Sequence, residues 1–129
     1  MHAVLRSLTS VDCPVPLDIY EPEQPDHFGL VVAALVGPDE GQGEEIFYVT
    51  VCSPTWLAEV TESKNGCGKG FQFLRHHLLV NRWDFVLVQR AIDDLCRTTS
   101  GRAWTEVAMK LSRFLAWEFE DYENGRAQT

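Results

Sequence analysis

Basic residues, long apolar runs and closely paired cysteines are what this 129-residue sequence has least of. Eleven lysines and arginines stand against 19 aspartates and glutamates, which gives a formal net charge of −8 and an isoelectric point near 4.8. Such a negative field repels phosphate backbones and anionic lipid, so it disfavours direct nucleic-acid or membrane binding and favours a basic protein partner. No apolar run approaches the roughly 20 residues of a membrane span.

The four cysteines are widely spaced, and no Cys-x-x-Cys pair occurs. The sequence also lacks a zinc-ligand spacing, so we expect no metal and no cofactor. No signal-peptide pattern precedes the first polar segment, and a cytoplasmic protein with reduced thiols is therefore expected. The length is that of one domain, 1–129, with 124–129 expected to be a frayed tail.

Four segments have the composition of β-strands. Ala3–Leu8 predicts a short first strand, and the proline-rich residues 11–26 predict an extended surface segment. Phe28–Val36 is a nearly unbroken apolar run, which predicts a central strand buried on both faces. Ile46–Cys52 predicts its hairpin partner, and Phe71–Val80 predicts a further strand.

Three helices follow from capping and periodicity. Ser53 as N-cap with Pro54 at the first helical position starts a short helix, and Asp84 is the N-cap of a longer one. At about 100° per residue, one arc of Trp104–Tyr122 is apolar, which predicts a long last helix with this arc in the core. The residues on the arc are Trp104, Val107, Ala108, Leu111, Phe114, Leu115, Phe119 and Tyr122. The order of elements predicts an α+β fold: a mainly antiparallel sheet of about four strands, with two longer helices and one short helix packed on one face.

Two neighbouring residues break the pattern of the last helix. Glu118 falls inside the apolar arc, where a lone carboxylate would be costly, so we expect it to pair with Arg75 of the sheet. Trp117 falls outside the arc, beside Glu120 and Asp121. An indole with a polar rim is typical of an interface anchor, although Trp117 could equally cover the end of the helix.

The turn between the second and third strands is rich in acid. It contains Asp39, Glu40, Glu44 and Glu45 within a glycine-rich stretch. Each carboxylate alone would be an ordinary solvated side chain. Together with the acidic end of the last helix, they predict a field that attracts a basic partner and speeds its capture.

Two other functions remain open at this stage. Adjacent strand residues point to opposite faces, so His76 and His77 could not both bind one metal. Either histidine could still act as a general base with Cys52 or Cys67 as nucleophile, as in a small cytosolic enzyme. A homodimeric interaction module that pairs through an exposed sheet edge is the other alternative.

Several blocks of the sequence are similar to the immunity protein 8 family. They are Val51–Leu57, Arg75–His76 with the strand that ends at Leu79–Val80, Trp104–Arg113 and Trp117–Tyr122. The last block, Trp-Glu-Phe-Glu-Asp-Tyr, is the most specific of them. The resemblance covers most of the chain, from the first strand to Tyr122.

This resemblance implies an α+β immunity protein of a bacterial polymorphic toxin system. Such a protein is not an enzyme: it is an antitoxin that binds a cognate toxin domain and neutralises it. Combined with the charge, the resemblance predicts that an acidic surface covers a basic, nuclease-like site of the toxin. The residues expected to contact the toxin are Trp117, Glu120, Asp121, Asp39, Glu40, Glu44 and Glu45.

Overall fold

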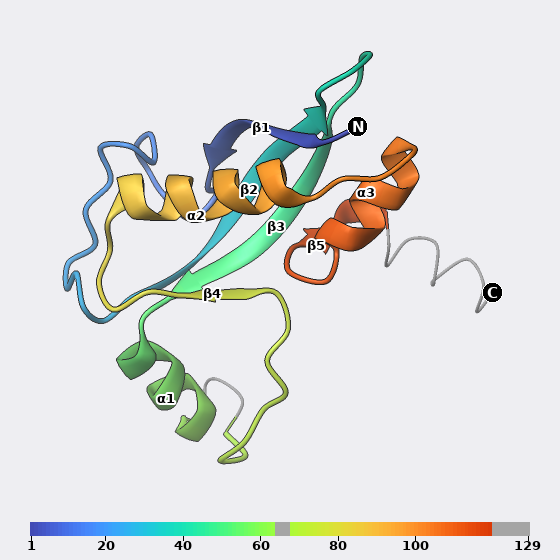
Figure 1. Ribbon diagram of the computed structural model, residues 1–129. Helices are drawn as coiled ribbons and strands as arrows, with labels where there is room; N and C mark the ends of the chain where they lie inside the picture. Colours follow the sequence, from blue (N-terminus) through green and yellow to red (C-terminus); the bar gives the residue numbers. More distant parts are fainter. Residues whose placement is uncertain (64–67, 120–129) are drawn as a thin grey trace.

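A meander of three antiparallel strands forms most of the sheet. The computed structural model describes residues 1–63 and 68–119, and the strands are β1 (Ala3–Thr9), β2 (Gly29–Pro38) and β3 (Glu45–Cys52) (Figure 1). β2 pairs antiparallel with both neighbours, with Ala34 opposite Leu8 on one side and Phe47 on the other. The first three predicted strands and their hairpin are therefore confirmed.

Two short strands flank β3 on its other side. β4 (His77–Leu79) runs parallel to the end of β3, and β5 (Ala116–Trp117) runs antiparallel to its beginning. The predicted strand Phe71–Val80 is wrong over residues 71–76. His76 has a φ of +59°, which is left-handed backbone and interrupts an extended strand.

The helices of the described chain are α1 (Pro54–Glu62), α2 (Phe85–Thr98) and α3 (Trp104–Leu111). α1 and α2 begin where their capping residues predicted, and α3 begins at Trp104, where the apolar arc begins. The Ser53 hydroxyl accepts a hydrogen bond from the backbone of α1, and the Asp84 carboxylate accepts one from the Leu87 N–H at 3.3 Å. Within the described ranges, no helix combines the length and apolarity needed to cross a membrane.

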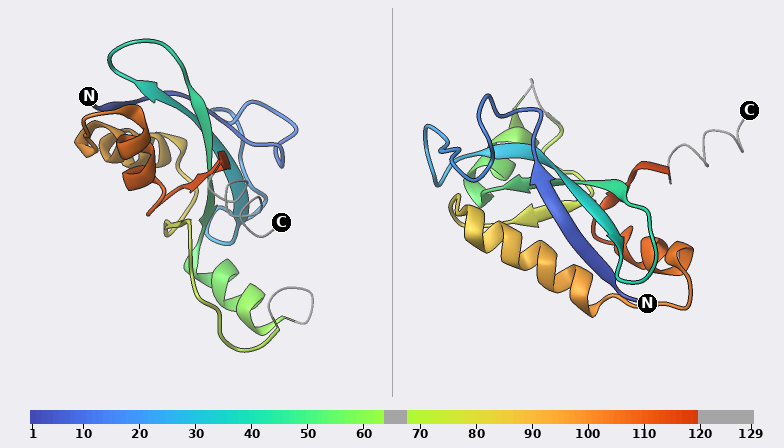
Figure 2. Two further views of the ribbon diagram at one scale, coloured as in Figure 1. Left: turned by 90° about the vertical axis from the view of Figure 1, so that its right-hand side faces the viewer. Right: turned by 90° about the horizontal axis from the view of Figure 1, so that it is seen from above.

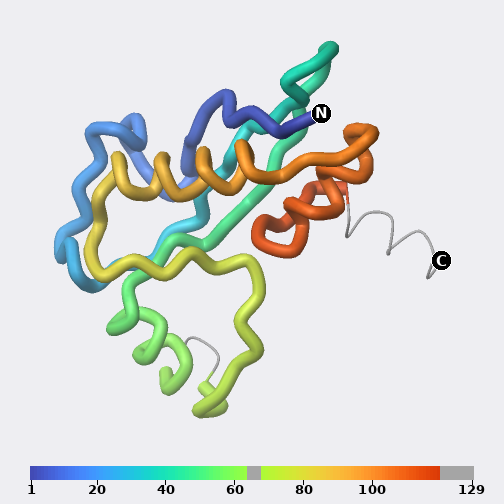
Figure 3. The backbone as a smooth tube through the Cα atoms, in the orientation of Figure 1, coloured from blue at the N-terminus to red at the C-terminus, as the bar shows by residue number. Residues whose placement is uncertain are grey.

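The helices are not all packed on the sheet. α2 and α3 lie over one face of the sheet, whereas α1 projects beyond the far end of β3 (Figures 1 and 2). The first residues of the chain lie beside the segment between α2 and α3 (Figure 3). There the Ala3 N–H donates to the Thr99 carbonyl at 3.3 Å, and the Gly101 N–H donates to the Met1 carbonyl at 3.0 Å. The α+β class is confirmed.

The core lies between the sheet and α2 and α3. Along β2, Leu30, Val32 and Val36 are buried, whereas Val31 on the opposite face is exposed. The prediction that this strand is buried on both faces is therefore wrong, because helices cover one face alone. Buried residues from the strands and helices form one hydrophobic cluster: Leu30, Val32, Val36, Phe47, Val49, Val51, Val88, Ile92, Cys96, Val107, Ala108, Leu111 and Leu115.

The last helix is shorter than predicted, because α3 ends at Leu111. In a continuing helix, the Ser112 carbonyl would accept a hydrogen bond from the N–H of Ala116. Instead Ser112 O lies 2.8 Å from Nε2 of His76, and Ala116 pairs with Tyr48 of β3. Tertiary contacts thus override the helical periodicity beyond Leu111.

This ending changes the surroundings of the residues that follow. Glu118 is exposed, so the inward-facing carboxylate predicted from the helical arc is wrong. Phe114 and Phe119, placed by the same arc in the core, are 56% and 42% exposed. Tyr122 and the predicted tail, 124–129, lie outside the described residues.

Candidate functional site

The acidic turn forms the loop of the β2–β3 hairpin at one end of the sheet (Figure 1). We call the residues Asp39, Glu40, Glu44 and Glu45 the acidic hairpin. The first three side chains are exposed, and Glu45 is half-buried at the start of β3. The sequence reasoning placed these four carboxylates together, and the structure brings them together.

Asp39 is the most firmly held member of the acidic hairpin. Its Oδ1 accepts a hydrogen bond from the His2 backbone N–H at 2.9 Å, and its Oδ2 lies 3.7 Å from Nδ1 of His2. The Asp39 N–H in turn donates to the His2 carbonyl at 2.9 Å. The hydrogen bond from the His2 backbone lowers the pKa of Asp39, because it stabilises the ionised carboxylate. Asp39 is therefore a fixed negative charge.

Trp117 lies beside this hairpin, although it is 72 residues from Glu45 in the sequence. Its ring stacks on Phe47 with a centroid separation of 6.4 Å and an interplanar angle of 16°. Its Nε1 donates a hydrogen bond to the Glu45 carboxylate. Trp104 also contacts Phe47 edge-on, with ring centroids 6.5 Å apart. Through these contacts the half-buried indole connects β5 to Phe47 of the core and to Glu45 of the acidic hairpin.

Phe119 is the exposed aromatic residue next to Trp117. Its ring meets the Trp117 ring edge-on, with centroids 6.3 Å apart and an interplanar angle of 80°. Sequence reasoning missed this residue, since the helical arc assigned Phe119 to the core and left Trp117 outside. The structure reverses these two assignments.

Other predicted site residues are placed differently. Arg75 is exposed in the segment before β4, and Glu118 is exposed after β5. An exposed carboxylate does not require an ion pair, so the reason for expecting Glu118 to pair with Arg75 no longer holds. Glu120 and Asp121 lie outside the described residues.

The histidines and cysteines of the enzyme alternative are not arranged as an activated pair. Because a carbonyl can only accept, Nε2 of His76 must carry the proton that Ser112 O binds, and Nδ1 of His77 must donate to Arg75 O at 2.7 Å. Cys52 is fully buried, and this burial raises the pKa of its thiol. A buried thiol with a raised pKa is a poor nucleophile at neutral pH. Cys67 lies outside the described residues.

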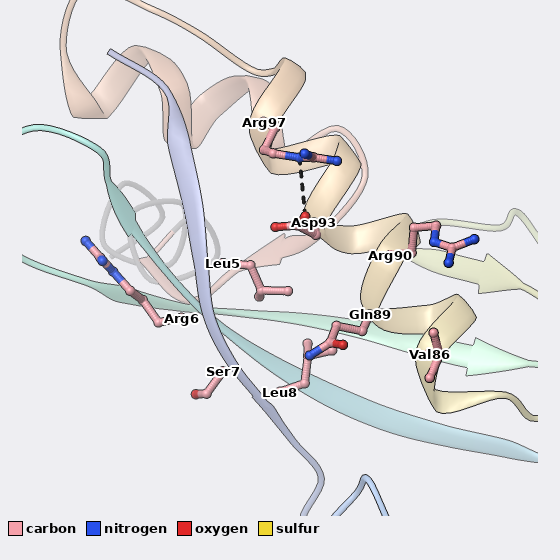
Figure 4. A pocket seen from close by; sticks show the side chains of 9 residues that line it. All are labelled: Leu5, Arg6, Ser7, Leu8, Val86, Gln89, Arg90, Asp93 and Arg97. Atoms are coloured by element: carbon pink, nitrogen blue, oxygen red, sulfur yellow. Dashed lines mark ion pairs between the residues drawn. The ribbon is translucent and has the colours of Figure 1, made fainter.

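An open groove of about 500 Å³ lies between β1 and α2 (Figure 4). Leu5 and Leu8 point from β1 toward α2, where Arg97 pairs with Asp93 at 3.3 Å. None of the described residues that line it is a histidine or a cysteine. In the part of the chain that the structure describes, no three histidine, cysteine or acidic side chains gather as metal ligands.

Together these features define a small acidic α+β protein with a cluster of carboxylates on one hairpin loop. The chain belongs to the immunity protein 8 family, whose sequence profile it matches over residues 3–122. This match covers most of the chain and confirms the resemblance seen in the sequence blocks. No curated protein and no solved structure gives a significant match.

Proposed function

We propose that this protein neutralises a cognate toxin domain of a bacterial polymorphic toxin system by binding to it in the cytoplasm. Membership of the immunity protein 8 family supports the class of function. The protein would act as an inhibitor and not as a catalyst. The buried Cys52 and the absence of a metal-ligand cluster among the described residues are consistent with this reading.

The acidic hairpin is the proposed contact surface for the toxin. The observation that carries this assignment is the grouping of Asp39, Glu40 and Glu44 as exposed carboxylates on one loop. The chain is acidic overall, so a basic toxin would be attracted from a distance and oriented toward this loop. A nuclease-like toxin, whose substrate cleft is positive, fits this chemistry.

Phe119 supplies an apolar contact at the edge of the same surface. Exposed charges mainly accelerate association, whereas desolvated aromatic residues slow dissociation. Trp117 packs against Phe119 and donates a hydrogen bond to Glu45, so we assign it the role of positioning Phe119. Glu120 and Asp121, which follow directly in the sequence, remain part of the proposed surface.

Charge reversal tests this assignment. The toxin domain that the proposal places in the neighbouring gene would be co-expressed with the protein, and growth rescue and binding kinetics would be measured. The double variant Glu40→Lys/Glu44→Lys should lower the association rate by roughly 10- to 100-fold at low salt and reduce rescue.

The matched control is Glu21→Lys/Glu23→Lys, which makes the same charge change at two exposed residues of the proline-rich segment. Added salt should reduce the wild-type association rate steeply. If both double variants slow association equally, the acidic hairpin has no special role. If the wild-type protein does not rescue growth from the neighbouring toxin, the proposed function itself fails.

A further inference from the structure

The strand β1 lies at one edge of the described sheet, with β2 on its inner side. We call the side of β1 that faces away from β2 the outer edge. In an antiparallel pair, alternate residues direct their N–H and C=O groups toward the neighbouring strand, and the residues between them direct these groups away. His2 faces β2, because its carbonyl accepts from the Asp39 N–H at 2.9 Å. The alternation therefore turns the backbone groups of Ala3 and Leu5 to the outer edge.

Leu8 also directs its backbone groups to the outer edge. The register of β1 shifts just after Leu5, and the pairing beyond this shift places Leu8 opposite Ala34. The Phe28 carbonyl accepts from the Ser53 N–H on the β3 side, and Ala34, an even number of residues further on, faces the same way. Leu5 and Leu8 thus present two N–H donors and two C=O acceptors. No hydrogen bond from elsewhere in the described residues reaches these four groups.

The chain itself shows that the outer edge accepts extended backbone. Ser100, in the segment between α2 and α3, forms an antiparallel bridge with His2. In this bridge the Thr99 carbonyl accepts from the Ala3 N–H at 3.3 Å. These bonds end at Ala3, so the outer edge from Leu5 onward is open to a further strand.

This open part of the edge borders the groove of about 500 Å³ between β1 and α2 (Figure 4). The half-buried Leu5 and Leu8 point from β1 toward α2, and Val86 of α2, which also lines the groove, is 59% exposed. A strand placed beside β1 would bring its apolar side chains against these three residues. The groove thus combines backbone donors and acceptors with apolar contacts, which is how strand addition recognises an extended peptide.

We propose that the toxin domain adds an extended segment to the outer edge of β1, in the groove between β1 and α2. This inference rests on the toxin binding proposed above and gives it a second contact. The outer edge is continuous with the acidic hairpin, because the His2 backbone that holds Asp39 directly precedes β1. At about 3.4 Å per residue, Leu5 is about 10 Å from His2 along the chain. A toxin docked on the acidic hairpin can therefore reach the outer edge.

Other candidate occupants fit the outer edge less well. A second copy of the chain could offer its own β1, but two copies that each carry a net charge of −8 repel each other, whereas a basic toxin is attracted. Lipid and nucleic acid lack a peptide backbone, and anionic forms of both are repelled by the same charge.

Amide hydrogen exchange tests the proposal directly. ¹⁵N-labelled protein would be measured free and saturated with the toxin domain that the proposal places in the neighbouring gene. In the free protein the Leu5 and Leu8 amides should exchange rapidly, whereas the Val4 and Thr9 amides, which face β2, should be protected. Toxin binding should slow exchange at Leu5 and Leu8 at least about tenfold, because both N–H groups then donate to the added strand.

A proline at the outer edge gives a matched pair of variants. Leu8→Pro removes the N–H that would donate to the toxin, and proline is tolerated in an edge strand where the N–H faces away from the sheet. Leu8→Ala truncates the same side chain and retains the N–H. Leu8→Pro should therefore bind the toxin about tenfold more weakly than Leu8→Ala, and equal affinities would contradict the proposal. Unfolding temperatures would show whether both variants fold, and the exchange measurement on the wild-type protein depends on neither.

The outcomes separate this contact from the proposed function. Unchanged exchange at Leu5 and Leu8, in a complex that Glu40→Lys/Glu44→Lys weakens, would refute the edge contact and leave toxin binding at the acidic hairpin intact. Slow exchange at both amides in the free monomer would refute the open edge. A dimer in sedimentation velocity, with protection that rises with protein concentration, would assign the outer edge to a second copy. Failure of the wild-type protein to bind the toxin would refute the proposed function and this contact with it.

Discussion

Replacing Trp117 distinguishes a structural role from direct toxin contact. A buried tryptophan truncated to alanine typically costs 3–5 kcal/mol, and for the half-buried Trp117 we expect about 2–3 kcal/mol. The loss has two parts, the stacking on Phe47 and the hydrogen bond to Glu45. At about 2.1 cal/mol/K per residue, the 129-residue chain has an unfolding entropy of about 0.27 kcal/mol/K. Trp117→Ala should therefore lower Tm by roughly 7–11 °C.

Trp117→Phe separates the two parts, because it retains an aromatic ring on Phe47 and removes the Nε1 donor. Hydrogen bonds to charged groups contribute about 1.5–3 kcal/mol, and partial exposure reduces this to about 1 kcal/mol here. Urea unfolding of Trp117→Phe, Glu45→Ala and the double variant should give a coupling energy of about 0.5–1 kcal/mol.

Phe119→Ala is the control for both variants. Phe119 is exposed, so this substitution should change stability by less than about 0.5 kcal/mol while weakening toxin binding. The reasoning would be refuted if Trp117→Ala kept the wild-type Tm and lost toxin neutralisation. In that case Trp117 would be a contact residue and not a support for Phe119.

Three further perturbations test separate parts of the structure. A Cβ added in Gly29→Ala would lie 2.2 Å from the Trp56 ring, so calorimetry should show a loss of about 1–3 kcal/mol, partly recovered by Trp56→Leu. Asp39 has a lowered pKa in the folded state, so its stabilising effect is present above its unfolded-state pKa near 3.8 and disappears as pH falls through the lower folded value. Asp39→Asn should accordingly flatten the fall in unfolding free energy below that pH, as measured by urea titrations. Burial raises the pKa of Cys96 to about 12, so mass spectrometry should find Cys96 unmodified by iodoacetamide in the native protein at pH 8 and alkylated in urea.

The elements that the sequence predicted well are those set by local chemistry. Ser53 with Pro54, and Asp84, cap α1 and α2 where their side chains indicated, because an N-cap bond spans two or three residues. The acidic hairpin was equally predictable, since its carboxylates are adjacent in the sequence and the flanking apolar runs define the turn.

The elements that the sequence did not predict depend on contacts between distant residues. Helical periodicity continues past Leu111, but the His76–Ser112 hydrogen bond and the stacking of Trp117 on Phe47 end α3 and create β5. No sequence pattern reveals a two-residue strand. The meeting of Trp117 with the acidic hairpin, and the exposure of Phe119, follow from that rearrangement and were not predictable for the same reason.

The contact of the first residues with the segment between α2 and α3 has a consequence for synthesis. The Ala3 N–H donates to the carbonyl of Thr99, and α2 packs over β1, so these contacts of the first strand cannot form until residue 99 has been synthesised. At about 5–20 residues per second, the roughly 90 residues from the end of β1 to Thr99 take about 5–20 s. From the synthesis of Cys52 until α2 has formed, the apolar face of the meander has no helix to cover it. If the protein protects its cell from a toxin as proposed, translation begun after the toxin arrives leaves the cell unprotected for at least this interval. Protection would then depend on molecules already folded when the toxin appears.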